Sequence, residues 1–302
     1  MHTFYSDHLT FPLPRGHRFP VSKWSLLRQR IVAEGTVAPE HLHASPPATD
    51  AQLLLAHSHS YVARVTGGQL SEREVRRIGL PWSPQLVERA RRSTGGTIAA
   101  CRAALRDGIA VNLAGGTHHA SRDQGQGYCV FNDSIVAIRV MQAEGLIRRA
   151  VVIDCDVHQG NGTASLAAGD PSIYTFSIHC ESNFPLHKTP GDLDVDLPDG
   201  TGDEAYLQAL EEGLDRSLQE ADACLAIYLA GADPWHGDRL GRLALTKEGL
   251  ARRDRQVLTR CRRQDLPAAI VMAGGYGPVD DTASIHLETV RIAAQLAKTP
   301  NH

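Results

Sequence analysis

Two short clusters of residues in this sequence could do chemistry. His118 and His119 follow a Gly-Gly pair, and Asp154, Asp156 and His158 occur later, at the end of an apolar run. The run predicts a buried strand, on which alternate side chains point to the same face. Three polar groups on one face are costly to bury unless a metal ion or hydrogen-bond partners compensate them. With a His-His pair nearby as acid–base groups, the pattern predicts a metal-dependent hydrolase.

The predicted metal ligands are Asp156, His158 and Asp233, the last of which lies in a Gly-Ala-Asp-Pro segment. One imidazole and two carboxylates leave a coordination position open for water or substrate, which is typical of a catalytic zinc site. A strand-end turn with local hydrogen bonds is the alternative for the first two. Asp154 lies deeper and needs a buried partner. It could orient His118, help to hold a monovalent cation, or be purely structural.

Three aromatic residues in predicted loops add further candidates. Tyr276 follows two glycines that allow a sharp turn, so its hydroxyl could reach a developing oxyanion. Tyr128 and Phe184 lie beside glycine or proline and could wall a narrow substrate channel. Ordinary packing is the alternative for each of the three.

The elements that must position these residues alternate between apolar and amphipathic stretches. Strands are predicted at the apolar runs 109–113, 150–154, 173–178, 224–230 and 269–273. Helices are predicted at 21–34, 83–107, 132–144, 203–221, 246–263 (with Thr246 as N-cap) and 281–297. Continuous apolar strands alternating with helices predict an α/β fold with a parallel sheet covered on both faces. Sites in such sheets form beyond the carboxyl ends of the strands, where the candidate residues fall. The Asp-rich segment 191–202 is predicted to be an exposed loop.

Composition narrows the possible functions. The 302 residues are 42% hydrophobic and no linker divides them, which predicts one domain spanning 1–302. The formal net charge is −3, no basic face for nucleic acid is evident, and the Arg-rich stretch 89–92 is predicted to be a solvated helix face. We expect neither a membrane span nor a signal peptide. Six scattered cysteines without a Cys-x-x-Cys pair predict a reducing, cytoplasmic location rather than disulfides or a zinc knuckle.

In combination and order, three motifs resemble the histone deacetylase family, the zinc-dependent acyl-lysine and acylpolyamine amidohydrolases. They are Gly-Gly-Thr-His-His-Ala at 115–120, Asp-Cys-Asp-Val-His at 154–158 and Gly-Gly-Tyr at 274–276. The segments 16–20, 183–185 and 237–242 more closely resemble the class IV branch and its bacterial relatives. The resemblance implies the arginase-deacetylase fold, a three-layer α/β/α sandwich around a mostly parallel, eight-stranded sheet.

The resemblance also implies a role for each matching residue. It makes His119 the general base, His118 a second histidine supported by Asp154, and Tyr276 the residue that stabilises the transition state. The ligands of one zinc ion per chain are implied at Asp156, His158 and Asp233. A channel for an acyl-lysine side chain is implied at Gly127, Tyr128 and Phe184. A structural potassium site is implied beside the zinc, at Asp154, Asp156, His158, Ser177 and Ile178.

Asn161 is the main departure from the family pattern. Class I members carry an aspartate there, hydrogen-bonded to the general-base histidine, whereas Asn161 can orient a ring nitrogen but has no charge. Two other functions remain as alternatives. A ureohydrolase with two manganese ions would need aspartates where this chain has Gly160 and Gly231, and a non-catalytic acyl-lysine binding module would need neither a base nor an oxyanion donor.

The sequence leaves the substrate open. Acetyl or longer fatty acyl groups fit the pattern, on a lysine of a peptide or protein, on a polyamine, or on a small metabolite. The choice between zinc and ferrous iron, and the oligomeric state, are open as well.

Overall fold

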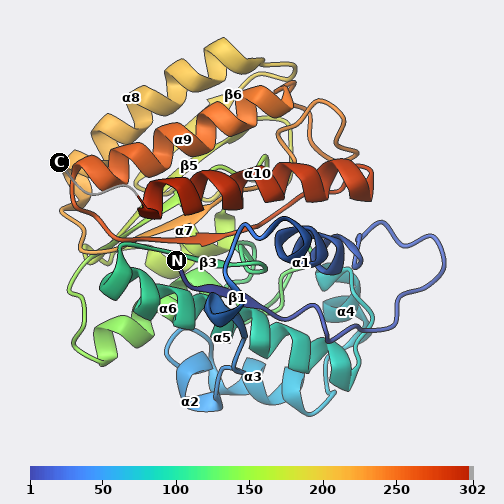
Figure 1. Ribbon diagram of the computed structural model, residues 1–302. Helices are drawn as coiled ribbons and strands as arrows, with labels where there is room; N and C mark the ends of the chain where they lie inside the picture. Colours follow the sequence, from blue (N-terminus) through green and yellow to red (C-terminus); the bar gives the residue numbers. More distant parts are fainter. Residues whose placement is uncertain (299–302) are drawn as a thin grey trace.

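A single sheet of eight parallel strands forms the centre of the computed structural model, which describes residues 1–298. Residues 299–302 of the predicted domain lie outside this range. The strand order is β2-β1-β3-β8-β7-β4-β5-β6. Helices cover both faces of the sheet (Figure 1). The predicted α/β/α sandwich around an eight-stranded sheet is therefore confirmed.

The predicted strands and helices are all present, with small shifts at their ends. The strands are β1 (Thr3–Tyr5), β2 (Leu42–Ala44), β3 (Ile109–Asn112), β4 (Ala150–Asp154), β5 (Ile173–Cys180), β6 (Leu193–Leu197), β7 (Ala226–Leu229) and β8 (Ala268–Val271). The helices are α1 (Lys23–Glu34), the 3-10 helix η1 (Pro39–His41), α2 (Asp50–Leu53), α3 (His59–Thr66), α4 (Glu72–Ile78), α5 (Pro84–Asp107), α6 (Asp133–Ala143), α7 (Asn161–Ala167), α8 (Asp203–Ala221), α9 (Lys247–Arg263) and α10 (Val279–Lys298).

Two hydrophobic cores lie against the two faces of the sheet. On β4, Val151 and Ile153 face the core formed with α1, α8, α9 and α10, while Ala150 and Val152 face the core formed with α5 and α6. Figure 1 shows α8, α9 and α10 on one side of the sheet and α2 to α6 on the other. Because both faces are covered, the central strands β4, β7 and β8 consist almost entirely of apolar residues, as the continuous runs predicted.

Local signals set the ends of the helices. The side chain of Ser83 caps α5 by accepting a hydrogen bond from the backbone N–H of Leu86, and Gly108, at φ 86°, follows its last turn. Thr246 caps α9 in the same way, through the N–H of Gly249 at 2.9 Å, as predicted. Among residues 1–298, no helix combines the length and the apolar character that crossing a membrane requires.

Two predictions about exposed segments are wrong. Within the segment predicted to be a loop, Leu193–Leu197 forms the edge strand β6, paired with β5. Its Leu-Asp-Val-Asp-Leu sequence alternates apolar and acidic residues, which suits a strand with one covered face. Three-residue strands such as β1 and β2 were not predicted because they are too short to show a period.

Arg89 is the other wrong prediction, because it is buried rather than on a solvated helix face. Burial lowers the pKa of its guanidinium to about 10, against a smaller opposing effect of Asp7. Arg89 donates a hydrogen bond to Ser6 Oγ. Arg91 and Arg92 of the same stretch are partly exposed, and they form ion pairs with Asp50 and Glu88 respectively.

Phe176 of β5 tests the packing of the core. Its side chain is 1% exposed and lies against Gly213 of α8, where a Cβ atom would come within 2.3 Å of the ring. We expect Phe176→Ala to lower the free energy of unfolding by about 3–5 kcal/mol, because the truncated side chain leaves a cavity. Urea denaturation should show a lower midpoint with an unchanged slope. The control is Leu146→Ala, at a side chain that is 52% exposed, which should change stability by less than about 0.5 kcal/mol. Equal effects of the two substitutions would contradict a tightly packed core.

Candidate active site

The candidate residues gather at the carboxyl ends of four neighbouring strands. His118 and His119 follow β3, Tyr276 follows β8, Asp233 follows β7 and Asp156 follows β4. Because the four strands are adjacent and parallel, their carboxyl ends meet at one edge of the sheet.

The chain leaves β4 earlier than the sequence suggested. The strand ends at Asp154, so strand alternation does not align Asp156 and His158 with it, and that prediction is wrong. A tight turn brings the residues together instead. Asp154 Oδ1 accepts a hydrogen bond from the backbone N–H of Asp156 at 3.1 Å, and Asp156 Oδ1 accepts one from the N–H of His158 at 3.0 Å.

Asp156, His158 and Asp233 form a buried cluster in which potential ligand atoms lie within 4.8 Å of one another. His158 Nδ1 lies 2.9 Å from Asp156 Oδ1 and 3.3 Å from Asp233 Oδ2. Apart from this 3.3 Å ion pair with His158, no group in residues 1–298 donates a hydrogen bond to Asp233 Oδ2. A buried carboxylate oxygen with so little hydrogen bonding is costly, and a cation bound there would remove the cost. The donor set of one nitrogen and two carboxylates therefore fits a catalytic zinc ion or a similar divalent metal.

The electrostatics of the cluster also favour a cation. Burial opposes a charge on His158, but the carboxylates of Asp156 and Asp233 outweigh it and raise the pKa of the imidazole to about 10. Burial, together with the charge of Asp156, raises the pKa of Asp233 to about 7. Without a metal ion, protons take the place of the positive charge that these groups require.

Glycines keep space free around the cluster. A Cβ atom at Gly274 would come within 1.9 Å of Asp233 Oδ2, and the backbone N–H of Gly274 donates to Asp156 Oδ2 at 2.7 Å. At the two positions where a ureohydrolase needs further aspartates, a Cβ atom at Gly160 would come within 2.4 Å of Asp154 Oδ2, and one at Gly231 would come within 2.8 Å of Asp233 Oδ1. Side chains of the kind that hold a second metal are thus absent from these two positions.

The two adjacent histidines have different partners. His118 Nδ1 lies 2.6 Å from Asp154 Oδ2, and His119 Nδ1 lies 2.7 Å from Asn161 Oδ1. The two residues lie in a turn, and their rings lie side by side with centroids 4.1 Å apart. Because an amide oxygen can only accept, His119 carries its proton on Nδ1 and keeps the lone pair of Nε2 free.

The surroundings of His118 and His119 shift the pKa values of the two imidazoles in opposite directions. Burial disfavours a charge on His118, but Asp154 and Asp156 outweigh it and raise the pKa to about 9. Burial and the neighbouring His118 and His158 lower the pKa of His119 well below its ordinary value. His119 is therefore suited to accept a proton, and His118 to remain charged.

Tyr276 is held at the edge of the cluster. Its backbone N–H donates to Asp238 Oδ2 at 2.6 Å, and its ring lies 6.2 Å from that of His158. Burial and the nearby carboxylates, Asp156 first among them, raise the pKa of its hydroxyl well above the usual range. The hydroxyl therefore stays protonated and able to donate a hydrogen bond.

A cavity leads from the surface to this cluster. The predicted channel residues Gly127, Tyr128 and Phe184 line it, and so do three residues of the centre: His119, His158 and Tyr276. The ring of Phe184 stands perpendicular to that of His119, with centroids 4.8 Å apart. The structure thus brings the three predicted channel residues to the mouth of the site.

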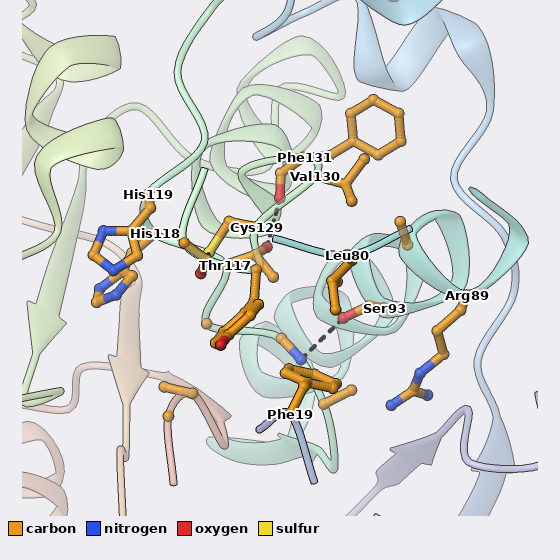
Figure 2. Close-up of a pocket in the computed structure, with 18 of the residues that line it drawn as sticks. Phe19, Leu80, Arg89, Ser93, Thr117, His118, His119, Cys129, Val130 and Phe131 are labelled. Atoms are coloured by element: carbon orange, nitrogen blue, oxygen red, sulfur yellow. Dashed lines mark hydrogen bonds between the residues drawn. The ribbon is translucent and has the colours of Figure 1, made fainter. Parts of the chain in front are cut away.

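A second cavity extends from the histidine pair into the protein (Figure 2). In Figure 2 the rings of His118 and His119 lie at one side of this cavity and Arg89 at the other, with Phe19 and Leu80 between them. Ser93 Oγ holds the glycine turn before the histidines, by accepting from the N–H of Gly115. Neither this cavity nor the position of Arg89 was predicted, since buried polar residues on a helix give no sequence signal of their own.

The residues of the predicted potassium site lie next to one another. Asp154 of β4 is paired with Ser177 of β5, and both line a small cavity. Ser177 Oγ lies 2.9 Å from His179 Nδ1, and Ile178 is fully buried. Carboxylate, hydroxyl and main-chain oxygens of the kind that these residues carry are the ligands that a hard cation prefers. The potassium site itself stays a prediction.

Two supporting residues, Asp238 and Arg253, were not predicted from the sequence. Asp238 accepts the hydrogen bond from Tyr276 described above. Arg253 is fully buried and donates hydrogen bonds to Gly231 O at 2.6 Å and Cys155 O at 3.3 Å, next to the turns that carry the metal ligands. Arg253 lies three residues after Leu250 and four before Val257, on the buried face of α9, so the helical spacing was the signal that could have found it.

Comparisons with known proteins agree with this arrangement. The family description "Histone deacetylase domain" matches residues 17–292. An uncharacterised protein of Picosynechococcus sp. is 44% identical over 273 residues, covering 90% of this chain and 91% of that protein. A histone deacetylase-like amidohydrolase of Pseudomonas aeruginosa is 29% identical over 287 residues, covering 88% and 74%. The crystal structure of an HDAC homologue from Aquifex aeolicus superposes with a TM-score of 0.83 at 22% identity, over 99% of this chain and 84% of that one.

Proposed function

Since the chain belongs to the histone deacetylase family and is a hydrolase that acts on amides, we propose that it removes an acyl group from a lysine side chain or a related amine with one metal ion. The ion, zinc by the chemistry of its donors, is held by Asp156, His158 and Asp233. The observation that carries the proposal is the buried cluster of two carboxylates and one imidazole, in which Asp233 Oδ2 has no partner in residues 1–298 other than His158 Nδ1 at 3.3 Å.

Each of the residues around the metal site has a separate role in hydrolysis. A bound divalent metal supplies Lewis-acid polarisation of the acyl carbonyl and a lowered pKa for water. Neutral His119 takes the proton from the attacking water, because its Nε2 has a free lone pair. The Tyr276 hydroxyl donates a hydrogen bond to the developing oxyanion. His118, kept cationic by Asp154, stabilises this negative charge or supplies the proton for the leaving amine.

The two cavities suit a slender acylated amine. The mouth between Tyr128 and Phe184 is walled by aromatic rings, against which the methylene groups of a lysine or a polyamine can pack. The inner cavity, with Phe19 and Leu80 in its wall, offers room for the acyl group beyond the carbonyl. Acetyl and longer fatty acyl groups are therefore both proposed substrates, on lysine or on a polyamine.

A panel of substrates tests the proposal. The purified protein should release the free amine from at least one of a set of acetylated and fatty-acylated lysine peptides and acylpolyamines, and a hydroxamate should inhibit this by chelation. Binding of these compounds without any cleavage would favour an acyl-lysine binding module. Two metals at this cluster with cleavage of a guanidinium substrate would favour a ureohydrolase.

Asn161 gives a prediction about pH. We expect Asn161→Asp to raise the pKa of His119, because an anion next to Nδ1 stabilises the imidazolium. The base form of His119 is lost when the pH falls through this pKa. The acid limb of kcat/KM, which reports the free enzyme, should therefore move to higher pH.

Kinetics across pH, with the metal content of each protein as control, check this shift. Below the new pKa the variant should be slower than the wild type, while well above it the stronger base could compensate. An acid limb that stays in place or moves to lower pH, with the metal fully retained, would mean that Asn161 does not act on the general base.

A further inference from the structure

A second group of histidines lies at the amino ends of the strands, away from the catalytic cluster. His2 precedes β1, His41 ends η1 directly before β2, and His43 lies within β2. The strands β1 and β2 are parallel and pair Phe4 with His43, which brings the three imidazoles to one place. The catalytic residues follow the carboxyl ends of other strands, so the two groups are separate.

The three rings are arranged around a common point. One ring nitrogen from each lies within 4.8 Å of the others. His2 Nδ1 lies 2.7 Å from His43 Nε2, their rings are stacked at 5.0 Å, and the ring of His41 meets His2 edge-on at 4.7 Å. Within the described residues 1–298, the buried Nδ1 of His41 has no hydrogen-bond partner. A buried nitrogen without a partner is costly unless it has a ligand.

Asp107 completes the group from the far side of His2. Its Oδ2 lies 3.5 Å from His2 Nε2, the nitrogen that faces away from His43. Arg106 also pairs with this carboxylate, at 2.7 Å. A carboxylate close to one ring nitrogen favours the proton on that nitrogen and leaves the lone pair on the other, which is the usual surrounding of a metal-binding histidine.

We propose that His2, His41 and His43 form a second metal site, which takes zinc or another divalent ion that prefers imidazole ligands, with Asp107 as the outer carboxylate. Zinc–nitrogen bonds of 2.0–2.1 Å in tetrahedral geometry separate ligand nitrogens by about 3.3 Å. The rings of His2 and His43 therefore move apart slightly when the ion binds.

The expected effect of this site is structural. It connects the start of β1, the η1–β2 segment and the end of α5, which form one end of the sheet. An ion that binds only the folded chain raises its free energy of unfolding. Once the ion concentration exceeds the dissociation constant, this gain grows with the logarithm of the ratio of the two. Catalysis does not require this ion, since none of its ligands lines either cavity of the active site.

Metal counting in an untagged full-length protein tests the proposal. The wild type, His43→Ala, Asp233→Ala and the double variant are equilibrated with Zn²⁺, dialysed and measured by elemental analysis. We expect two equivalents in the wild type, one in each single variant and none in the double variant. The control is His59→Ala, an exposed histidine of α3, which should keep both equivalents.

The counts separate this proposal from the proposed function. One equivalent in the wild type that is lost in Asp233→Ala and kept in His43→Ala would overturn the second site alone. One equivalent with the opposite pattern would support the second site and contradict the catalytic metal. The His43→Ala variant should also keep the deacylase activity of the wild type, and loss of that activity with the catalytic metal retained would overturn the separation of the two sites.

Asp107→Asn adds a readout that a purely structural histidine group would not move. It should weaken the affinity of this site for Zn²⁺ by about 10- to 100-fold, as measured by competition with a chelator in an Asp233→Ala background. An unchanged affinity would remove Asp107 from the site. An Asp233→Ala protein that binds no Zn²⁺ at all, while remaining folded by circular dichroism, would overturn the site itself.

Discussion

Asp233→Ala should abolish both amide hydrolysis and metal binding at the Asp156–His158–Asp233 cluster. Asp233 supplies one of the two carboxylates in the cluster, and its Oδ2 has no partner in residues 1–298 other than His158 Nδ1. With three ligands reduced to two, the site no longer holds the ion that hydrolysis requires. Activity should fall to the detection limit, and elemental analysis should show the loss of one equivalent.

The number of metal equivalents is measured most clearly in a His43→Ala background, where only the catalytic cluster is expected to bind metal. There the stoichiometry should fall from one to zero. Glu72→Ala, which removes a carboxylate that is 90% exposed on α4, is the matched control and should change neither metal content nor activity. Two equivalents in the His43→Ala protein, or full activity after exhaustive chelation, would contradict a mononuclear metal hydrolase.

Tyr276→Phe should lower kcat by about 10²- to 10³-fold, the usual effect of removing one oxyanion donor. The reason is the hydroxyl, which stays protonated next to the cluster, while the ring and the Gly-Gly turn remain in place. Because the hydroxyl acts on charge that develops only in the transition state, KM should change much less than kcat. Steady-state kinetics and metal analysis of the same preparations measure both effects.

Tyr174→Phe is the matched control for this substitution. It removes a hydroxyl on β5 that bonds to Glu220, remote from the cluster, and should leave kcat near that of the wild type. A Tyr276→Phe protein with near-normal kcat would exclude Tyr276 from the mechanism. Loss of metal together with the activity would instead assign Tyr276 a role in forming the site.

The sheet and the reactive centre could be predicted because both leave short-range signals. Val151 and Ile153 face one core and Ala150 and Val152 the other, so β4 is apolar at every position before Asp154 and stands out as a buried strand. The rule that sites form at the carboxyl ends of parallel strands then brings together His118, Asp156 and Asp233, which are far apart in the sequence.

Features that depend on long-range packing could not be predicted. Arg89 is one of several arginines on α5, and its burial depends on Ser6, a residue of the segment that follows β1. Similarly, the alternating Asp residues of β6 suggested a loop because its pairing with β5 in the sheet is not visible in its local sequence. The turn after β4 brings Asp156 to His158 by hydrogen bonds rather than by strand alternation.

Hydrolysis of an acyl amide by water is tested most directly by the fate of the solvent oxygen. The protein is incubated in H₂¹⁸O with the substrate that responds best in the panel, and both products are measured by mass spectrometry. We predict equal amounts of free amine and of a carboxylate carrying one ¹⁸O atom, with neither product formed by Asp233→Ala. A metal-loaded, folded protein that binds acyl-lysine peptides or acylpolyamines but releases no labelled carboxylate would contradict the proposed function.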